Sequence, residues 1–508
     1  MNNVLNLVER VVTPEMNQSL LQNYTTEEVH RALFQMHPSK SPGPNGMFPF
    51  FFQIFWHIVG VDVTNAVLSV LHSGHMLHKM NFTHIVLIPQ KNEPMYMSDF
   101  QPISLENVVA RIISKVIANR LKMILPNVIS DAQSAFVPDR LITDNTTVAF
   151  EVLRRMRNKR SGKKGQMAVK LDISKAYDRM EWSFLRQMVL KLRFDGRWVN
   201  LAMKTVCTAS YSILIKEEPR GFVQPSWGIK QGDPLSPYLF LLCAEGLSGM
   251  IRRAVENREI RGVLSCPNGV CISHLLFADD SFLFCEASVE ECQRLMDILG
   301  QYEAASGQAI NRQKTTLFFS RNTREEVKQN IQQMLGARIM TDCEKYHGLP
   351  MACGKSKVNT FKELQERITK RVMGWKEKFI SKAMREILIK TIAQAIPTYT
   401  MNILKLPKAL CDSINSTLAK YWWRQTKDGE KIQWINWRKL CTTKKKGGME
   451  FRDIQAFNLA MLAKQAWRLI HHTLSFTCIQ SMILSKLFLH GGRDWTQPIF
   501  CVAEFGGC

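Results

Sequence analysis

The chain has 508 residues, 45% of them hydrophobic and 22% charged, an ordinary composition for a folded protein that excludes wholesale disorder. This length is enough for a large core and for more than one domain. Lys and Arg number 67 against 44 Asp and Glu, and the net charge of +23 favours a polyanionic partner, with nucleic acid before an anionic membrane.

The first part of the chain is expected to be mainly helical. Residues up to about His37 favour helix and lead into Ser41–Gly46, a run of turn formers that cannot continue it. Phe48–Leu71 is apolar and also favours a helix. Thr83–Pro89 predicts a short buried strand, and Leu105–Leu125 has apolar residues at helical spacing.

The middle of the chain combines strands and helices around acidic residues. A basic loop at Asn158–Gly165 precedes a predicted strand at Gln166–Asp172, and Tyr177–Leu192 favours a helix. Another helix is expected to start at Asp233, a good N-cap that is followed by proline. Ser273–Glu286 has apolar runs on both sides of an acidic pair, which predicts a β-hairpin with the pair at or near its turn.

The last third of the chain is predicted to be helical and basic. Apolar residues three or four apart indicate an amphipathic helix in Phe361–Phe379, and further helices are expected at Ser381–Ile392 and Ala409–Trp423. Gly354–Gly448 holds 22 Lys and Arg against 7 Asp and Glu. Such a stretch suits a surface that grips nucleic acid, because each phosphate contact releases counterions.

Three aspartates stand where apolar strands end. Asp279 and Asp280 lie between the apolar runs Leu275–Phe277 and Phe282–Phe284, where two adjacent carboxylates are costly unless a cation compensates them. Asp172 ends another apolar strand. If the two strands are neighbours, three carboxylates converge, and hard oxygen ligands favour Mg²⁺ or Mn²⁺. Two such ions serve in-line phosphoryl transfer. The alternative is a calcium-like or purely structural site.

Cysteine usage and hydropathy indicate the compartment. The 13 cysteines are odd in number and form no close CxxC pair, so we expect reduced, mostly buried thiols in a nuclear or cytoplasmic protein. The chain has no leading apolar segment, and no run approaches the ~18 apolar residues of a membrane span. We therefore expect neither secretion nor membrane insertion, and the oligomeric state stays open.

Three stretches follow one another along the chain: Leu171–Asp178, Gly228–Pro237 and Phe277–Asp280. In this order they closely resemble the palm motifs of reverse transcriptases. Shorter signatures are similar to those of the LINE-type, non-long-terminal-repeat retrotransposons of plants. These are Pro42–Gly46, Leu87–Pro89, Pro102–Leu105, Ser306–Gln308 with Asn311 and Lys314, Gly348–Pro350, Ile396–Tyr399, and Gly447–Gly448 followed by Phe451–Asp453. The resemblance covers nearly the whole chain.

The resemblance implies an α+β fold, a right-hand polymerase with fingers, palm and thumb, an antiparallel palm sheet and a mainly helical, basic C-terminal region. It divides the chain into an N-terminal helical extension (1–80), fingers and palm (81–350), a basic thumb-like region (351–430) and the truncated start of a zinc-binding-like region (431–508). No zinc is expected there, because the available ligands lack zinc spacing: His471, His472, Cys478 and Cys501.

The resemblance also implies the catalytic groups. Asp172, Asp279 and Asp280 match the metal-binding carboxylates, and the carbonyl of Ile173 is expected to help them. Two Mg²⁺ ions, or Mn²⁺, are the expected cofactors. The expected partners are an RNA template, a DNA primer or target site, and dNTPs, which together define an RNA-directed DNA polymerase.

Substrate contacts are implied in the same way. Tyr177 matches the bulky residue that blocks a ribose 2′-hydroxyl and so favours dNTPs, and Gln231 and Gly232 match the loop lining the incoming nucleotide and template. Arg111 is a cation near the expected triphosphate. Lys314 falls where polymerases place a proton donor for pyrophosphate, and a solvated lysine after a turn is the alternative.

Several positions depart from the family pattern. Gln101 stands where an arginine is expected to help hold the triphosphate, which leaves Arg111 and Lys91 as nearby cations. Further departures are Asn45 for Asp, Asp139 for Gly, His347 for an apolar residue, Met384 for a small residue, and Glu450 for Gly. An alternative function is therefore a catalytically defective element copy that only binds RNA or DNA. The Trp-rich end near Trp434 argues against an intron-encoded maturase, and Tyr177 against an RNA-dependent RNA polymerase.

Overall fold

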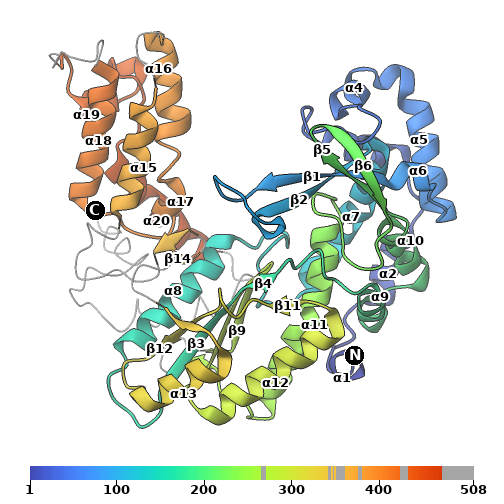
Figure 1. The fold of residues 1–508 in the computed structure, drawn as a ribbon. Helices are drawn as coiled ribbons and strands as arrows, with labels where there is room; N and C mark the ends of the chain where they lie inside the picture. The colour runs from blue at the N-terminus through green and yellow to red at the C-terminus, as the bar shows by residue number, and fades with distance from the viewer. Residues whose placement is uncertain are drawn as a thin grey trace. The chain divides into compact units, whose positions relative to one another are not determined.

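The computed structural model describes residues 1–264, 270–340, 345–346, 348–350, 361–375, 380–423 and 433–471. Its contacts divide the chain into two compact units. The first consists of Met1–Leu141, Arg160–Val263 and Ile272–Ile339, and the second of Ile142–Lys159, Leu264–Cys271 and Met340–Cys508. Figure 1 shows the elements of both units. No helix within the described ranges is both long and apolar enough to cross a membrane.

The first unit begins with helices, as expected, but the predicted helical stretch Phe48–Leu71 is divided into two helices at Phe55. The helices are α1 (Asn2–Leu5), α2 (Pro14–Leu21), α3 (Thr26–Phe34), α4 (Pro49–Ile54), α5 (Trp56–Ser73) and α6 (His78–Asn81). A reciprocal cap starts α3, because the Thr25 hydroxyl accepts from the Glu28 amide and the Glu28 carboxylate accepts from the Thr25 amide. Glu28 also pairs with Arg120 at 2.7 Å, which fastens the start of α3 to helix α7 (Val108–Val128).

A four-stranded sheet follows, with strand order β2-β1-β5-β6. Its strands are β1 (Phe82–Pro89), β2 (Phe100–Glu106), β5 (Ser210–Ile215) and β6 (Glu218–Val223). The β1–β2 and β5–β6 pairs are antiparallel and β1–β5 is parallel. The prediction of a strand at Thr83–Pro89 is confirmed, but the strand is mostly half-buried and its last two residues are exposed. Leu105 belongs to β2, so the predicted helix starts later, at Val108.

The second sheet of this unit has the order β13-β12-β3-β10-β9. Its strands are β3 (Gln166–Leu171), β9 (His274–Phe277), β10 (Asp280–Glu286), β12 (Thr316–Phe319) and β13 (Arg338–Ile339). All pairs are antiparallel except β12–β13 at the edge. The short elements η1 (Met97–Asp99), β4 (Ile173–Ser174) and β11 (Ala309–Ile310) also belong to this unit. The short strands β7 (Val263–Leu264) and β8 (Cys271–Ile272) each have one residue in either unit.

The remaining helices of the first unit follow in chain order. They are α7, α9 (Trp182–Lys191), α10 (Gly196–Cys207), α11 (Ser236–Glu256) and α12 (Val289–Ser306), with α13 (Glu325–Leu335) after them. Two predicted starts were wrong. Residues before Trp182 form turns, with Lys175 at φ +48°, so α9 begins well after Tyr177. Helix α11 begins at Ser236, although the Asp233 carboxylate still accepts from the amides of Leu235 and Ser236 at 2.7 and 3.0 Å.

One hydrophobic core joins the N-terminal helices to the rest of the first unit. It contains Val4, Leu20 and Val29 together with Phe184 and Phe240 of the later helices. Gly246 permits the close approach of α1 to α11, because a Cβ at this position would lie 3.1 Å from Cγ1 of Val4. The first 80 residues therefore pack as part of this unit.

The second unit is helical, as expected, and has its own hydrophobic core, which contains Phe150, Leu349 and buried residues from Phe361 to Ile454. Its elements are α8 (Ile142–Asn158), β14 (Lys345–Tyr346), β15 (Leu349–Pro350), α15 (Lys362–Met373), α16 (Lys382–Leu388), the π-helical turn η3 (Ile389–Ala393), α17 (Thr398–Met401), α18 (Lys408–Trp423), α19 (Trp437–Leu440), η4 (Lys444–Lys446) and α20 (Ile454–His471). The end of the predicted helix at Phe379 lies outside the described residues, as do His347, His472, Cys478 and Cys501.

Helix α8 joins this second unit although it precedes strand β3 in the chain. The Tyr346 hydroxyl donates to Asn145 Oδ1 at 2.7 Å, and Arg468 Nη1 donates to Asp144 Oδ2 at 3.1 Å. The ring of Phe150 packs in the core of the unit. Helix α8 is thus held by residues that lie some two to three hundred positions later in the sequence.

Candidate active site

The three predicted carboxylates lie at one end of two paired strands. Strand β10 pairs antiparallel with β3, with Ser281 opposite Leu171, so Asp280 starts one strand beside the residue that follows the other, Asp172. Strand β10 also pairs with β9, where Asp280 lies opposite Phe277. The predicted hairpin is therefore confirmed, and Asp279 lies in its two-residue turn.

The hairpin turn contains a residue in a sparsely populated conformation. Ala278 has φ +52°, in the left-handed region that residues other than glycine rarely adopt. Its amide donates to the side-chain oxygen of Gln133 at 3.1 Å. The tip that carries Asp279 thus depends on a residue well before it in the chain.

The aspartates influence one another electrostatically. Loss of hydration raises the pKa of Asp279; a backbone hydrogen bond opposes this rise, and the charge of Asp172 adds to it. Burial also raises the pKa of Asp280; the cation of Lys170 opposes this rise, and Asp279 and Asp172 add to it. The charge of Asp172 therefore acts on both carboxyls of the hairpin, and the charge of Asp279 acts on that of Asp280.

The side chains are not drawn together into a ligand cluster. Within the described ranges, no group of three or more His, Cys, Asp or Glu side chains is placed to hold a metal ion. Carboxylates that interact only with one another repel, whereas a divalent cation makes their convergence favourable. The donor set suits a hard cation because all three side chains end in carboxylate oxygens.

Ile173 and Lys314 lie beside Asp172. Ile173 of β4 pairs with Ile310 of β11, and the next amide, that of Asn311, donates to the Asp172 carbonyl at 2.8 Å. Lys314 closes the turn that begins at Asn311, and its side chain is exposed. The backbone thus brings Lys314 to the same corner of the sheet as Asp172.

Tyr177 is also near the hairpin tip. Its ring stacks on Phe240, with 5.3 Å between centroids and 10° between planes. Burial raises the pKa of the Tyr177 hydroxyl, and the charge of Asp279 adds to the rise. The Tyr177 carbonyl accepts from the Ile229 amide at 2.8 Å, which ties Tyr177 to the loop that contains Gln231.

That loop lies against the first sheet. The Gln231 carbonyl accepts from the Ser104 amide at 2.9 Å, and the Gln231 side chain accepts from Gln101 Nε2 at 3.4 Å. Gly232 has φ +108°, which requires glycine. Its carbonyl accepts from the ammonium of Lys40 at 3.4 Å. Sequence reasoning missed Lys40, although it precedes the recognised Pro42–Gly46 signature.

Arg111 occupies a different environment from the one expected of a triphosphate ligand. Its side chain is 1% exposed and donates to the Ser41 carbonyl at 3.4 Å. It shares this interior with Glu106 and Lys230, whose charged groups are 2.8 Å apart. The burial favours a structural role for Arg111. Lys91 is paired with Asp99 at 2.9 Å.

A buried polar network lies behind β9. Ser130 donates to Glu245 Oε1 from its amide at 3.1 Å and from its hydroxyl at 2.9 Å. The Ser130 and Ser248 hydroxyls are 3.0 Å apart, and Ser248 reaches His274 Nε2 at 2.9 Å. Burial lowers the pKa of His274 to about 3, so its ring is neutral at pH 7. The network joins α11 to the strand that leads into the aspartate hairpin.

This network predicts a pH-dependent stability at Glu245. Burial raises the pKa of this carboxyl from 4.5 to about 7, against Ser130, Arg252 and Arg140, which favour its charged form. The folded state then binds more protons than the unfolded state between these values, so stability falls as pH rises through them. Glu245→Gln is expected to be more stable than the parent by up to about 3 kcal/mol at pH 8, with little difference near pH 4.5.

Urea unfolding of both proteins across pH 4.5–8 measures this difference. Glu256→Gln is the matched control, because Glu256 is on the same helix, is 57% exposed and pairs with Arg253 only at the surface. A Glu245→Gln curve that runs parallel to the parental curve at all pH values would contradict the buried, proton-binding state.

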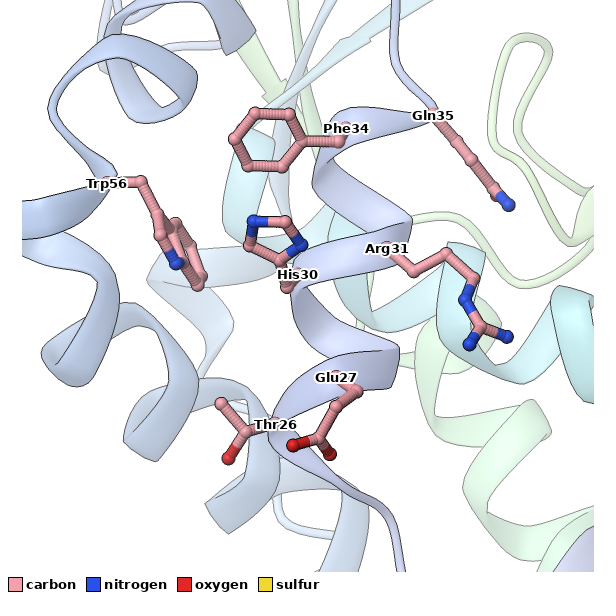
Figure 2. Close-up of a pocket in the computed structure, with 7 residues that line it drawn as sticks. All are labelled: Thr26, Glu27, His30, Arg31, Phe34, Gln35 and Trp56. Atoms are coloured by element: carbon pink, nitrogen blue, oxygen red, sulfur yellow. The ribbon is translucent and has the colours of Figure 1, made fainter.

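A separate hollow lies on α3 and α5 (Figure 2). The His30 ring stacks on Phe34 with 4.2 Å between centroids and meets the Trp56 ring edge-on at 5.5 Å. The lining is completed by Thr26, Glu27, Arg31 and Gln35. None of the predicted site residues lines this hollow, so it is distinct from the aspartate site.

The sequence matches the family described as "Reverse transcriptase (RNA-dependent DNA polymerase)" over residues 88–348, which is just over half of the chain. The chain belongs to the reverse transcriptase family. The match includes all three aspartates, the Tyr177 turn and the Gln231 loop. The two sheets and the helices of the first unit are accordingly the α+β fold of a right-hand reverse transcriptase.

Two of the relatives of this reverse transcriptase carry the names of transposable elements. It is 25% identical over 423 residues to the "Transposon TX1 uncharacterized 149 kDa protein" of Xenopus laevis, an alignment covering 81% of this chain and 31% of the relative. It is 26% identical over 277 residues to the Pol polyprotein of retrotransposable element R2DM of Drosophila melanogaster, covering 54% and 24%. An uncharacterized mitochondrial protein of Arabidopsis thaliana is 40% identical over 97 residues, covering 19% and 62%. The chain thus spans about a third of the length of the first relative.

Proposed function

We propose that this chain is the RNA-directed DNA polymerase of a plant LINE-type, non-long-terminal-repeat retrotransposon. It would transfer nucleotides from dNTPs to the 3′-hydroxyl of a DNA primer or nicked target site, on an RNA template. One observation carries the proposal: the pairing of β3 with β10 brings Asp172, Asp279 and Asp280 within electrostatic reach of one another. Membership of the reverse transcriptase family supports it.

Asp172, Asp279 and Asp280 are the residues that would hold two Mg²⁺ ions, or Mn²⁺, with help from the Ile173 carbonyl. When bound, these ions would lower the pKa of the primer 3′-hydroxyl and would neutralise negative charge on the triphosphate. Lys170 opposes the rise in the pKa of Asp280 and so helps keep that carboxyl ionised for a cation. Ionised ligands are required, because a protonated carboxyl has lost much of its donor capacity.

The neighbouring residues would select and orient the substrates. Tyr177 would exclude a ribose 2′-hydroxyl; its stacking on Phe240 and the effect of the Asp279 charge on its hydroxyl support this role. Gln231 and Gly232 would line the incoming nucleotide and the template. Lys314 at the corner of Asp172 would donate a proton to pyrophosphate. Such a polymerase would act in the nucleus or the cytoplasm, wherever its RNA and target DNA are found.

Primer extension on a defined RNA template tests the function. We expect Mg²⁺-dependent addition of dNTPs, with rNTPs added far more slowly. The same primer annealed to a DNA template separates template preference from general polymerase activity. A folded chain that binds the primer-template but adds no nucleotide with either Mg²⁺ or Mn²⁺ would exclude the proposal.

A second function, nucleic-acid binding without catalysis, is favoured by the environment of Gln101. This uncharged side chain replaces the arginine expected to hold the triphosphate, and it donates a hydrogen bond to the side chain of Gln231. The second unit carries the surplus positive charge that RNA or DNA binding needs, including the exposed run Lys444–Lys446. A defective copy would therefore retain salt-sensitive binding.

Gln101→Arg decides between these two functions. An arginine can bind a phosphate through two charge-assisted hydrogen bonds, so we expect the KM for dNTP to fall roughly tenfold if the rest of the site works. The measurement is steady-state primer extension at varied dNTP concentration. Gln90→Arg, at an exposed position directly after the neighbouring strand β1, is the control for added charge. Tight RNA binding by Gln101→Arg without any extension would instead favour the binding function.

A further inference from the structure

The aspartate hairpin is supported by a segment that does not belong to the palm motifs. This support segment, Ser130–Arg140, runs beside β9: the Leu276 amide donates to the Ala132 carbonyl at 2.7 Å, and the Ser134 amide donates to the Leu276 carbonyl at 3.0 Å. Gln133 is opposite Leu276 in a parallel bridge. The support segment thus pairs with the edge strand β9 in the way that a further short strand would.

Gln133 connects this segment to the hairpin tip. Its side chain is fully buried at 0% exposure. Its Oε1 atom accepts from the Ala278 amide at 3.1 Å and from the Ala135 amide at 2.9 Å. Its Nε2 atom has no hydrogen-bond partner among the described residues. The hydrogen bonds of this side chain are therefore made by its oxygen. One of the two donors is the amide of Ala278, the residue beside Asp279.

The support segment is itself held firmly. The Arg140 guanidinium donates to the carbonyls of Ser130 at 2.6 Å, Gln133 at 2.8 Å and Ile129 at 2.9 Å. Ser130 is bonded to Glu245 of α11. The position of Gln133 is thus fixed by α11, through Ser130, and by Arg140.

The tip needs this support because of Ala278. At φ +52° an alanine is disfavoured, since its Cβ crowds the following carbonyl oxygen. The hydrogen bond from the Ala278 amide to Gln133 stabilises the left-handed turn and fixes the direction in which the next two residues leave it. Those residues are Asp279 and Asp280.

We propose that Gln133 is a positioning residue for the metal-binding carboxylates, acting through the Ala278 amide. This inference rests on the proposed function for its kinetic consequences, while the structural linkage between Gln133 and the tip stands independently. Gln133 contacts the backbone on both sides through its oxygen and sets the geometry in which Asp279 and Asp280 present theirs.

Gln133→Met tests the proposal, because methionine nearly preserves the volume and removes the acceptor. We expect the Mg²⁺ concentration for half-maximal primer extension to rise roughly tenfold, with a smaller change in the KM for dNTP. Adding Ala278→Gly to this variant should recover most of the loss, because glycine adopts positive φ without the side-chain hydrogen bond. Gln394→Met is the matched control, since Gln394 is equally buried and bonds a backbone carbonyl in the second unit.

A second measurement needs no catalysis. Hydrogen exchange at the Ala278 amide should speed up at least about tenfold in Gln133→Met, and affinity for Mn²⁺ measured by electron paramagnetic resonance should fall. If the parent chain fails to polymerise but these two shifts appear, the proposed function fails and the positioning role stands. If Mg²⁺ dependence, Mn²⁺ affinity and Ala278 exchange all match the parent, or if Ala278→Gly gives no recovery, the positioning role is overturned.

Discussion

Replacing Asp279 with asparagine is expected to lower the rate of primer extension by roughly a hundred- to a thousandfold, the loss typical when one group that stabilises transition-state charge is removed. The substitution is nearly isosteric and removes one of three interacting carboxylates. It also removes the charge that raises the pKa of Tyr177. Single-turnover extension on an RNA template, with Mg²⁺ and then Mn²⁺, measures the loss.

A control variant and a stability measurement distinguish loss of catalysis from loss of folding. Asp297→Asn changes an exposed aspartate of α12 that accepts from Gln293 of the same helix, so its extension rate should equal that of the parent. Thermal unfolding of Asp279→Asn should be unchanged or slightly higher, because one like charge has been removed. Extension that persists at the parental rate in Asp279→Asn would remove this residue from the catalytic set.

Lys230→Met is expected to give the largest loss of stability, about 3–5 kcal/mol, because it leaves a buried carboxylate without its partner. The Lys230 and Glu106 side chains are 4% and 1% exposed and their charged atoms are 2.8 Å apart. The Lys230 ammonium also donates to Asn81 Oδ1 at 2.5 Å. The measurement is the shift of the urea transition of the first unit relative to the parent.

The pH dependence of this loss follows from Glu106. Burial raises the pKa of the Glu106 carboxyl, and Lys230 partly offsets that rise. Without the lysine the pKa rises further, so the carboxyl is neutral and tolerated at low pH, and the loss grows as pH increases. The double variant Lys230→Met with Glu106→Leu removes both charges and should recover most of the stability. A double variant no more stable than the single one would show that the ion pair is not the source of the effect.

The sequence predicted the aspartate hairpin because its signals are local. Apolar runs on both sides of Asp279 and Asp280 fix two strands, and the acidic pair interrupts them where a turn must fall. The pairing of β3 with β10 was expected only conditionally, since nothing within either run identifies its neighbour. The convergence of the carboxylates thus depends on contacts that join residues more than a hundred positions apart.

Other features had no local signal. Helix α8 has the pattern of an ordinary amphipathic helix, yet it belongs to the second unit through Asp144 and Asn145. Arg111 was predicted to be a cation near the triphosphate, but it is buried beside Ser41 and Glu106. The spacing of residues in its own helix does not predict this burial. The role of Gln133 could not be predicted for the same reason, because its hydrogen-bond partner is the backbone amide of Ala278, far away in the sequence.

Two departures from the family pattern acquire a physical meaning in the structure. Asp139 and Glu450 stand where glycine is expected, and both adopt left-handed backbone, with φ +62° and +58°. The fold has therefore kept the conformation that suits glycine while the residue has changed. Each position carries strain of about 1–2 kcal/mol that glycine would not, and the strain is smaller for aspartate, which tolerates this region better than glutamate.

The shared core of the first unit shows that the packed unit begins earlier in the chain than the family match does. The family match starts at residue 88, yet Val4, Leu20 and Val29 are buried with the helices that follow it. A chain cut at the start of the match would expose the faces of α7, α9 and α11 that these residues cover. The portion that matches the family is therefore smaller than the unit that packs around one core. Any exchange of this polymerase between proteins must carry its first eighty residues along.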